Sequence, residues 1–361
     1  MKIFIICPRL CYGGAERVGV VLANGLAEKG HNVIMISNLF EPITYTLNSN
    51  IQTLPLVKSN TNKLKKWSSS IPLVRQYIKK ELPDIIIGIL HTCSFIAKIA
   101  SIGLNVPVIA TEHDAFERPD SAPFTFGKKL AKFYLNKLYN NITVLTSVDK
   151  DLIKNKFKNV YVMPNPLAFH AAASVPPKEH TIIAAGRLED WHYKGFDILI
   201  KAWAKICKEH PKWTLKIAGV GTEEQKQFIL NIAKDTNIKD RVELLGFQED
   251  LKSLFNKAAI FVLSSRYEGF GLVLIEAMSQ GCACIAADYN GRQKEIITNN
   301  QNGITIKPDN IEELSNALTK LLINDKFRRE VAEKAIERSH FYDVKNITNK
   351  WEELLLSIIK Q

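Results

Sequence analysis

Short apolar runs alternate with helical stretches along the whole chain, and this alternation most strongly limits the folds open to it. Ten runs have the length and composition of buried strands: Ile3–Cys7, Val33–Ile36, Ile85–Ile89, Val108–Thr111, Ile142–Leu145, Thr181–Ala185, Leu215–Ala218, Val242–Leu245, Ile260–Leu263 and Ala283–Ala286. Apolar strands separated by helices are typical of parallel sheets that are covered on both faces. The sequence therefore predicts an α/β protein built from right-handed βαβ units.

The chain is long enough for two such domains. It has 361 residues, which is more than one core of ordinary size holds. Four prolines between residues 163 and 180 interrupt the pattern. We therefore expect a first domain over 1–165, a linker over 166–180 and a second domain over 181–340, with a C-terminal helix over 341–361 that crosses back to the first domain. Ligands should bind where the carboxyl ends of the strands face a cleft.

Basic residues are concentrated in the first half of the chain. The formal net charge is +11, and residues 1–168 hold 21 Lys and Arg against 11 Asp and Glu. The segment Lys58–Lys80 has seven basic residues and no acidic one. Such a patch predicts an anionic partner, which could be nucleic acid, an anionic membrane surface or a phosphorylated substrate. The sequence has no homeodomain, zinc-finger or RNA-recognition pattern, so we expect no nucleic acid.

This basic segment also has an apolar stripe. Five apolar residues recur in it at spacings of three and four: Leu64, Trp67, Ile71, Val74 and Ile78. The spacing predicts an amphipathic helix that docks the first domain on an anionic membrane. The alternative is that the stripe packs on the sheet and the lysines are merely solvated. Pro72 could also break or kink the helix.

The remaining composition indicates a cytoplasmic protein. No apolar window is long enough to cross a bilayer, and the first apolar run is too short for a secretory signal. The six cysteines form no C-x-x-C pair and no zinc-like spacing with histidine. We therefore expect reduced thiols and no metal site.

Two carboxylates eight residues apart follow the strand Ile260–Leu263. Glu268 falls in a glycine-containing loop, and Glu276 falls about two turns into the next helix. A loop carboxylate can accept hydrogen bonds from sugar hydroxyls. The neighbours of Glu276 are nearly all apolar, and a carboxylate in such a helix is rarely left unpaired. We therefore expect Glu276 to bind a ligand, against the alternative of a solvated helix residue.

Backbone groups at the start of the same helix form a second candidate. The N–H groups of Phe270, Gly271 and Leu272 can meet an anion there. Two basic residues, Arg187 and Lys194, lie in the glycine-containing loop after the strand Thr181–Ala185. A guanidinium fork and an ammonium point charge together suit a diphosphate. The alternative is a pair of solvated loop cations.

Weaker candidates follow other strands. Gly13 and Gly14 stand where the first strand turns into a helix, so the backbone can approach a phosphate, although the order is not G-x-G-x-x-G. His113 follows Val108–Thr111 and can bind a substrate hydroxyl or carry a proton. Gly219 and Phe247 are predicted to wall a nucleotide pocket. At each of these positions a plain turn, or for the histidine a structural role, is the alternative.

In combination these motifs resemble the retaining glycosyltransferases of family 4, which have the GT-B fold. The resemblance covers essentially the whole chain. It includes Gly13-Gly14, Glu112-His113, Gly186-Arg187 with Lys194-Gly195, and Glu268 with Glu276. It implies two Rossmann-like doubly wound domains that face a central cleft, the first binding the acceptor and the second the nucleotide-sugar. The stretch Leu188–Tyr193 is longer than in the family pattern, which leaves the path of that loop open.

The resemblance also implies a role for each motif of the second domain. Glu276 would bind the nucleotide ribose, and Glu268 would contact the donor sugar. Arg187 and Lys194 would bind the donor diphosphate. In the first domain, His113 would lie beside the donor sugar, and the Gly-Gly backbone would lie near the β-phosphate and the reaction centre.

The implied reaction moves a sugar, with retention, from a nucleotide-diphosphate sugar to a hydroxyl of a glycan or lipid-linked glycan in surface polysaccharide or glycoconjugate assembly. UDP is the favoured nucleotide, and no cofactor or essential metal is expected because no Asp-x-Asp metal site is visible where a GT-A enzyme would need one. The expected location is cytoplasmic and peripheral, on the inner face of the cell membrane. Two alternatives are a nucleotide-sugar epimerase of the same fold and a non-catalytic subunit that binds lipid-linked glycans.

Overall fold

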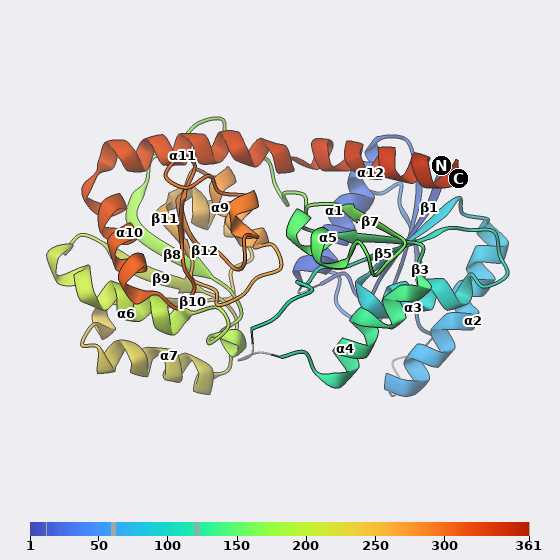
Figure 1. Cartoon of the computed structure of the whole chain (residues 1–361), viewed down its shortest axis with the longest axis horizontal. Helices are drawn as coiled ribbons and strands as arrows, with labels where there is room; N and C mark the ends of the chain where they lie inside the picture. Colours follow the sequence, from blue (N-terminus) through green and yellow to red (C-terminus); the bar gives the residue numbers. More distant parts are fainter. Residues whose placement is uncertain (12, 59–62, 120–122, 361) are drawn as a thin grey trace. The chain divides into compact units, whose positions relative to one another are not determined.

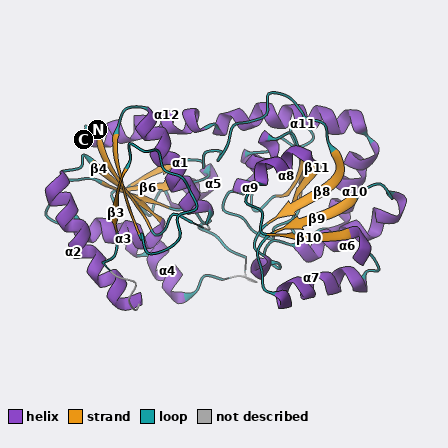
Figure 2. Cartoon of the chain, turned by 180° about the vertical axis from the view of Figure 1, so that it is seen from behind, coloured by secondary structure: helices purple, strands orange, loops and turns teal. Residues whose placement is uncertain are grey.

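The chain folds into two compact units. The computed structural model describes residues 1–11, 13–58, 63–119 and 123–360, with the backbone alone between 63 and 68. The first unit comprises Met1–Ala168 and Val344–Gln361, and the second comprises Phe169–Asp343. Each unit holds a parallel sheet with helices on both faces (Figures 1 and 2), as the alternating pattern predicts.

The first sheet has the strand order β3-β2-β1-β4-β5-β6-β7. Its strands are β1 (Lys2–Cys7), β2 (Asn32–Ser37), β3 (Gln52–Pro55), β4 (Ile85–Ile89), β5 (Val108–Thr111), β6 (Asn141–Val144) and β7 (Asn159–Val162). The chain builds β2 and β3 on one side of β1 and then β4 to β7 on the other. The order therefore reverses between β1 and β4, and ligands bind such sheets in the crevice at the carboxyl ends of these strands.

Helices cover both faces of this sheet. They are α1 (Gly14–Glu28), α2 (Lys63–Glu81), α3 (Leu90–Ala100), α4 (Phe126–Phe133), α5 (Ser147–Ile153) and α12 (Val344–Ile359). One face shares a core with α1 and α12, which contributes Trp351 and Leu355. The other face shares a core with α2 and α3 (Figure 1). The last helix of the chain is thus part of the first unit.

The second sheet has the order β10-β9-β8-β11-β12-β13. Its strands are β8 (Glu179–Ala185), β9 (Thr214–Ala218), β10 (Val242–Gly246), β11 (Ala258–Leu263), β12 (Ala283–Ala287) and β13 (Ile304–Ile306). Its helices are α6 (Phe196–Ile206), α7 (Glu223–Asp235), α8 (Leu251–Lys257), α9 (Leu272–Ser279), α10 (Ile311–Ile323) and α11 (Asp325–Ser339). Here the order reverses between β8 and β11, so the loops after these two strands flank the crevice.

The segment predicted as a linker over 166–180 is mostly bound to the second unit. The boundary between the units falls after Ala168. Lys178 Nζ donates to the carbonyl oxygens of Phe255, Asn256 and Gln280 at 3.0, 2.9 and 2.7 Å. Prolines remove backbone donors but leave carbonyls and packing surface, so a proline-rich segment can lie fixed on a domain without forming a helix or strand.

The apolar stripe of α2 faces the sheet wherever its side chains are described. Val74 and Ile78 are buried in the core, and Ile71 packs against it. Leu64, Trp67 and the three lysines between residues 63 and 66 lie outside the described side chains. The helix continues through Pro72. None of the helices in the described ranges is long and apolar enough to span a membrane.

Candidate functional site

The loops after β8 and β11 bring two predicted residues together at the carboxyl edge of the second sheet. Lys194 Nζ lies 2.6 Å from Glu268 Oε1. Ser265 Oγ donates to the same carboxylate oxygen at 2.9 Å. Lys194 and Glu268 are 74 positions apart in the chain, so the strand order, not the local sequence, pairs them.

These two loops are tied to each other by further contacts. Ser264 Oγ donates to the Lys194 carbonyl at 2.9 Å, and the Arg266 guanidinium holds both carboxylate oxygens of Asp197 at 2.8 and 2.9 Å. Gly195 has a φ of +65°, and a Cβ there would lie 2.0 Å from the Ser264 carbonyl oxygen. Only glycine fits this close approach. Lys194 and Glu268 therefore stand on a fixed backbone, as a preorganised site requires.

Arg187 lies at the other end of the loop after β8 and is held differently. Its side chain is 64% exposed and pairs with Glu189 at 3.0 Å and Asp190 at 2.5 Å in its own loop. Within the longer stretch, Leu188–Asp190 forms a 3₁₀ turn, and Trp191 packs on Phe228 of α7 with tilted rings whose centroids are 4.5 Å apart. Arg187 is thus an accessible cation paired within its own loop, whereas Lys194 is paired with a carboxylate of the loop after β11.

The helix α9 carries the remaining candidates of this edge. It begins at Leu272, and Gly271 at its N-cap has a φ of +91° with no side-chain cap. An uncapped helix start next to the crevice has N–H groups suited to an anion. Glu276 is fully buried within this helix. Phe270 packs its ring on Tyr342 with centroids 5.7 Å apart, so only its backbone remains for a ligand.

Gly219 and Phe247 follow β9 and β10. The Gly219 N–H donates to the Gly246 carbonyl at 2.8 Å. A Cβ on Gly219 would lie 1.8 Å from the Gly186 carbonyl oxygen, so close packing of these loops already requires glycine. Phe247 is 56% exposed at the end of β10. Both lie at the predicted edge, and their role in a nucleotide pocket stays a prediction.

At the first sheet, Gly13 and Gly14 stand at the start of α1 as predicted, but a carboxylate lies beside them. Glu16 is buried and accepts from Arg9 Nε at 3.0 Å. A Cβ on Gly13 would lie 1.9 Å from Glu16 Oε2. The sequence prediction of a phosphate at this helix start took no account of Glu16, whose negative charge competes with a phosphate there.

His113 follows β5 and is partly buried. Thr111 Oγ1 lies 3.0 Å from its Nε2. Burial lowers the pKa of His113 to about 4. The imidazole is therefore neutral at neutral pH, which suits a hydrogen bond to a hydroxyl better than a contact with a phosphate.

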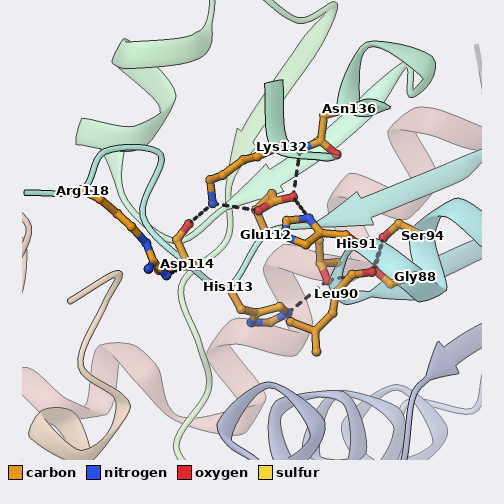
Figure 3. Close-up of polar contacts among 11 residues, drawn as sticks. Gly88, Leu90, His91, Ser94, Glu112, His113, Asp114, Arg118, Lys132 and Asn136 are labelled. Carbon is orange, nitrogen blue, oxygen red and sulfur yellow. Dashed lines mark hydrogen bonds and ion pairs between the residues drawn. The ribbon is translucent and has the colours of Figure 1, made fainter. Parts of the chain in front are cut away.

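A buried ion-pair network surrounds the neighbouring Glu112 (Figure 3). Its carboxylate oxygens lie 3.0 Å from Lys132 Nζ, 2.8 Å from Asn136 Nδ2 and 2.7 Å from His91 Nδ1. Lys132 also donates to the Asp114 carbonyl at 2.7 Å. Burial alone would raise the pKa of Glu112, but Lys132, His91 and Asn136 outweigh it and lower the pKa to about 2. The carboxylate is therefore ionised at any physiological pH.

The sequence prediction missed three members of this network. His91 lies two residues after the predicted strand Ile85–Ile89, as His113 lies two residues after its own strand, so the same rule could have found it. Lys132 and Asn136 belong to α4 and the following 3₁₀ turn Leu135–Leu138, and no spacing links them to Glu112.

Two further observations concern metals and thiols. Within residues 1–11, 13–58, 63–119 and 123–360, no group of three or more His, Cys, Asp or Glu side chains is placed to hold a metal ion. All six cysteines are buried and none forms a disulfide.

Comparison with known proteins gives matches over nearly the whole chain. Two family models match it: Glycosyltransferase Family 4 over residues 12–167 and Glycosyl transferases group 1 over residues 168–338. A glycosyltransferase of Haemophilus influenzae is 30% identical over 347 residues, which covers 95% of this chain and 96% of the relative. A relative from Campylobacter jejuni is 29% identical over 371 residues and covers 99% of each chain. Its name is GalNAc-alpha-(1->4)-GalNAc-alpha-(1->3)-diNAcBac-PP-undecaprenol alpha-1,4-N-acetyl-D-galactosaminyltransferase.

Solved structures match equally widely. Sucrose-phosphate synthase from Thermosynechococcus elongatus has a TM-score of 0.83 at 19% identity and covers 99% of each chain. Anabaena HepE in complex with UDP and glucose has a TM-score of 0.80 at 20% identity and covers 99% of this chain and 100% of that one. At such identities the likeness shows the fold alone, and it confirms the predicted GT-B type of two Rossmann-like units.

Proposed function

The chain belongs to the glycosyltransferases of family 4, and from this premise we propose that it moves a hexosyl or N-acetylhexosaminyl residue, with retention, from a UDP-sugar to a hydroxyl of a glycan or lipid-linked glycan. The observation that carries the proposal is the Lys194–Glu268 pair at the carboxyl edge of the second sheet. It sets a fixed cation and a fixed carboxylate beside the accessible Arg187 and the uncapped start of α9. This edge offers groups for both a diphosphate and a sugar.

The names of similar proteins support the finer parts of the proposal. The Campylobacter relative acts on an undecaprenol-linked glycan, and the HepE structure holds UDP and glucose. A relative from Erwinia amylovora, 26% identical over 360 residues, is named for amylovoran biosynthesis. A UDP-sugar donor and a glycan-assembly acceptor are therefore the first substrates to try.

The mechanism follows from the proposed donor. The acceptor oxygen attacks the anomeric carbon on the face from which the diphosphate leaves, so a new C–O bond forms as the old one breaks. The acceptor proton passes to the departing phosphate oxygen, and no side-chain nucleophile is needed. Lys194, Arg187 and the N–H groups at the start of α9 stabilise the charge that grows on the phosphate. Glu268 accepts hydrogen bonds from the sugar, and Glu276 binds the ribose.

We also propose that the first unit binds an anionic membrane, through α4 rather than α2. Along α4 and the turn after it, four apolar side chains are exposed at intervals of four residues: Phe126 (84%), Leu130 (44%), Tyr134 (61%) and Leu138 (44%). The side chain that α4 buries most deeply is instead Lys132, at 1% exposed. An amphipathic helix normally turns its apolar stripe to the core, so this helix is inverted.

The charged residues around these apolar side chains indicate an anionic partner. Lys128, Lys129 and Lys137 are exposed beside the apolar side chains. Apolar and aromatic side chains flanked by lysines are typical of helices that lie in the interface of an anionic bilayer. Docking there would bring the first unit to a lipid-linked acceptor.

The transferase proposal can be tested by product analysis. The purified protein is incubated with UDP-glucose, UDP-galactose, UDP-GlcNAc or UDP-GalNAc, with and without octyl glycosides of glucose, galactose and N-acetylgalactosamine as acceptors. We expect UDP release that depends on one acceptor, a product with α configuration by NMR, and activity that survives EDTA. Release without acceptor together with an epimerised sugar would favour the epimerase, and UDP-sugar binding without release would favour a non-catalytic subunit.

A further inference from the structure

The junction between β4 and α3 is built with backbone strain at a ligand-binding position. It follows β4 and therefore flanks the reversal point of the first sheet, as the loop with Glu268 does in the second. Leu90, a bulky residue, has a φ of +67°. Ser94 Oγ and Thr111 Oγ1 each donate to the Gly88 carbonyl at 2.9 Å and hold the junction in place. Left-handed backbone at a non-glycine residue persists only where its surroundings enforce it, and it clusters at ligand sites.

The strained turn presents His91, whose ring lies beside the Glu112 carboxylate. Its Nδ1 is buried and lies 2.7 Å from Glu112 Oε1, whereas the side chain as a whole is 32% exposed. Nε2 is on the far side of the ring from this contact, and it is not among the buried side-chain atoms without a hydrogen-bond partner. Glu112 cannot rotate freely, because Lys132 and Asn136 hold it from α4 and the turn that follows (Figure 3).

A carboxylate at Nδ1 favours the tautomer with its proton on that nitrogen, which leaves a lone pair on Nε2. The ring is then a fixed hydrogen-bond acceptor that faces outward at the carboxyl edge of the first sheet. Its environment carries little net charge, because Glu112 is neutralised by Lys132. Such a group recognises a hydroxyl and not a phosphate.

We propose that His91 binds the acceptor, and that its Nε2 accepts a hydrogen bond from a hydroxyl of the acceptor sugar while Glu112 and the strained turn at Leu90 position the ring. This rests on the proposed transferase function. It adds a residue that contacts the acceptor, alongside the donor contacts of the second unit. Glu112, Lys132 and Asn136 are positioning residues in this scheme.

Substitution of His91 by asparagine or by glutamine distinguishes the role of Nδ1 from that of Nε2. His91→Asn can keep the contact with Glu112, because its amide nitrogen falls near the Nδ1 position, but it lacks a group at Nε2. His91→Gln places an amide oxygen closer to the Nε2 position. With the octyl glycoside that gives the fastest transfer, we expect His91→Asn to raise the acceptor KM about tenfold and His91→Gln to recover part of that loss. The donor KM should stay within about twofold in both.

His31 provides a matched control in the same unit. It precedes β2, at the opposite edge of the same sheet, and its Nε2 lies 2.8 Å from Glu352 Oε1. His31→Asn should leave the acceptor KM unchanged, and melting temperatures will show that all three variants fold. A wild-type acceptor KM in folded His91→Asn, or a rise in the donor KM of equal size, overturns the assignment of His91. If the wild-type protein transfers no sugar to any acceptor, the proposed function itself fails and this inference fails with it.

Discussion

The carboxyl edges of the two sheets are built from the same strand, loop and helix units, yet they hold their charges differently. At the first edge Glu112 and Lys132 are 3% and 1% exposed and neutralise each other. At the second, the Arg187 side chain is 64% exposed and that of Lys194 is 24% exposed. A buried, compensated pair shapes a site without offering charge, whereas an accessible cation can meet an anion. The first edge is therefore suited to sugar hydroxyls and the second to a diphosphate.

The basic excess of the first half of the chain does not lie at the edge with Glu112. Residues 1–168 carry most of the formal charge of +11, but the edge with Glu112 is internally neutral. The cations that remain available lie elsewhere on the first unit, and Lys128 and Lys129 of α4 are among them. The charge asymmetry thus supports a role in docking more than one in binding a phosphorylated donor at the first edge.

The largest expected effect comes from breaking the buried pair at the first edge. Lys132→Met leaves the Glu112 carboxylate buried without its main counter-ion, which should lower the free energy of unfolding by about 3–5 kcal/mol. Denaturation in urea measures this loss. Lys205→Met, which removes an exposed partner of Glu312, should cost about 1 kcal/mol or less.

A double variant sharpens this first test. Lys132→Met combined with Glu112→Gln removes both charges and should restore part of the stability, because no uncompensated charge is left buried. Equal, small losses for Lys132→Met and Lys205→Met would show that the first edge does not depend on a compensated buried pair.

Substitutions at the second edge should lower the turnover number rather than the free energy of unfolding. Lys194→Ala and Arg187→Ala should each lower kcat about 100- to 1,000-fold, because each loses a cation that is proposed to stabilise the departing diphosphate. Lys216→Ala is the matched control, since Lys216 lies 3.4 Å from Glu243 and its side chain is 26% exposed, close to the 24% of Lys194. Rates at saturating donor and acceptor give kcat for each variant. A kcat like that of the wild type in Lys194→Ala or Arg187→Ala removes that residue from the mechanism.

His113 gives the stability of the first unit a pH dependence. The pKa of His113 is lowered from 6.5 to about 4 in the folded chain. The unfolded chain therefore binds more protons than the folded chain between these values, and stability falls as the pH falls from 6.5 towards 4. The His113 contribution is at most about 3 kcal/mol. Urea denaturation at pH 7.0 and 4.5 should show a smaller drop for His113→Asn than for the wild type, and an equal drop in both would contradict this assignment.

A smaller effect is expected for the carboxylate inside α9. Glu276→Gln keeps the size and polarity of the side chain but would lose the proposed charge-assisted bond to the ribose. The affinity for UDP should fall about 10- to 150-fold, or about 1.5–3 kcal/mol. Calorimetry with UDP measures it, and circular dichroism checks the fold. If a folded Glu276→Gln binds UDP as the wild type does, Glu276 is a structural residue of the core.

The sequence was most informative where strands are buried on both faces. All ten predicted strands are present within two residues of their expected ends. The three missed strands, β3, β7 and β13, each lie at the edge of a sheet. Edge strands bury less surface, so they are shorter and more polar, and the apolar pattern that marks a central strand is weak in them.

The positions of candidate site residues were predictable where a single rule, that ligand-binding residues follow the strands of a parallel sheet, applied to one segment of the chain. Lys194 and Glu268 each follow a strand, and parallel sheets gather such positions at one edge. Glu16 stands three residues after Gly13, the N-cap of α1, so the spacing by which a glutamate reaches back to a helix start could have found it. Lys132 was not predictable in this way, because α4 turns this lysine inward through tertiary packing that no spacing in the sequence records.

The smallest effect per residue is expected at the surface of α4. Lys128→Glu and Lys129→Glu should each weaken binding to vesicles that contain phosphatidylglycerol by about 1 kcal/mol, or about fivefold, and added salt should reduce the binding of the wild type. Co-sedimentation measures the bound fraction. Lys79→Glu and Lys80→Glu make the same charge change at the end of α2, on two lysines that are also exposed. Because the described apolar stripe of α2 is buried while that of α4 is exposed, the α4 variants should lose more binding. Equal losses would mean that charge alone attracts the first unit to the membrane. Larger losses from the α2 variants would place the docking surface on α2. A wild-type protein that does not bind anionic vesicles at low salt would contradict membrane docking and leave a soluble acceptor as the substrate to pursue.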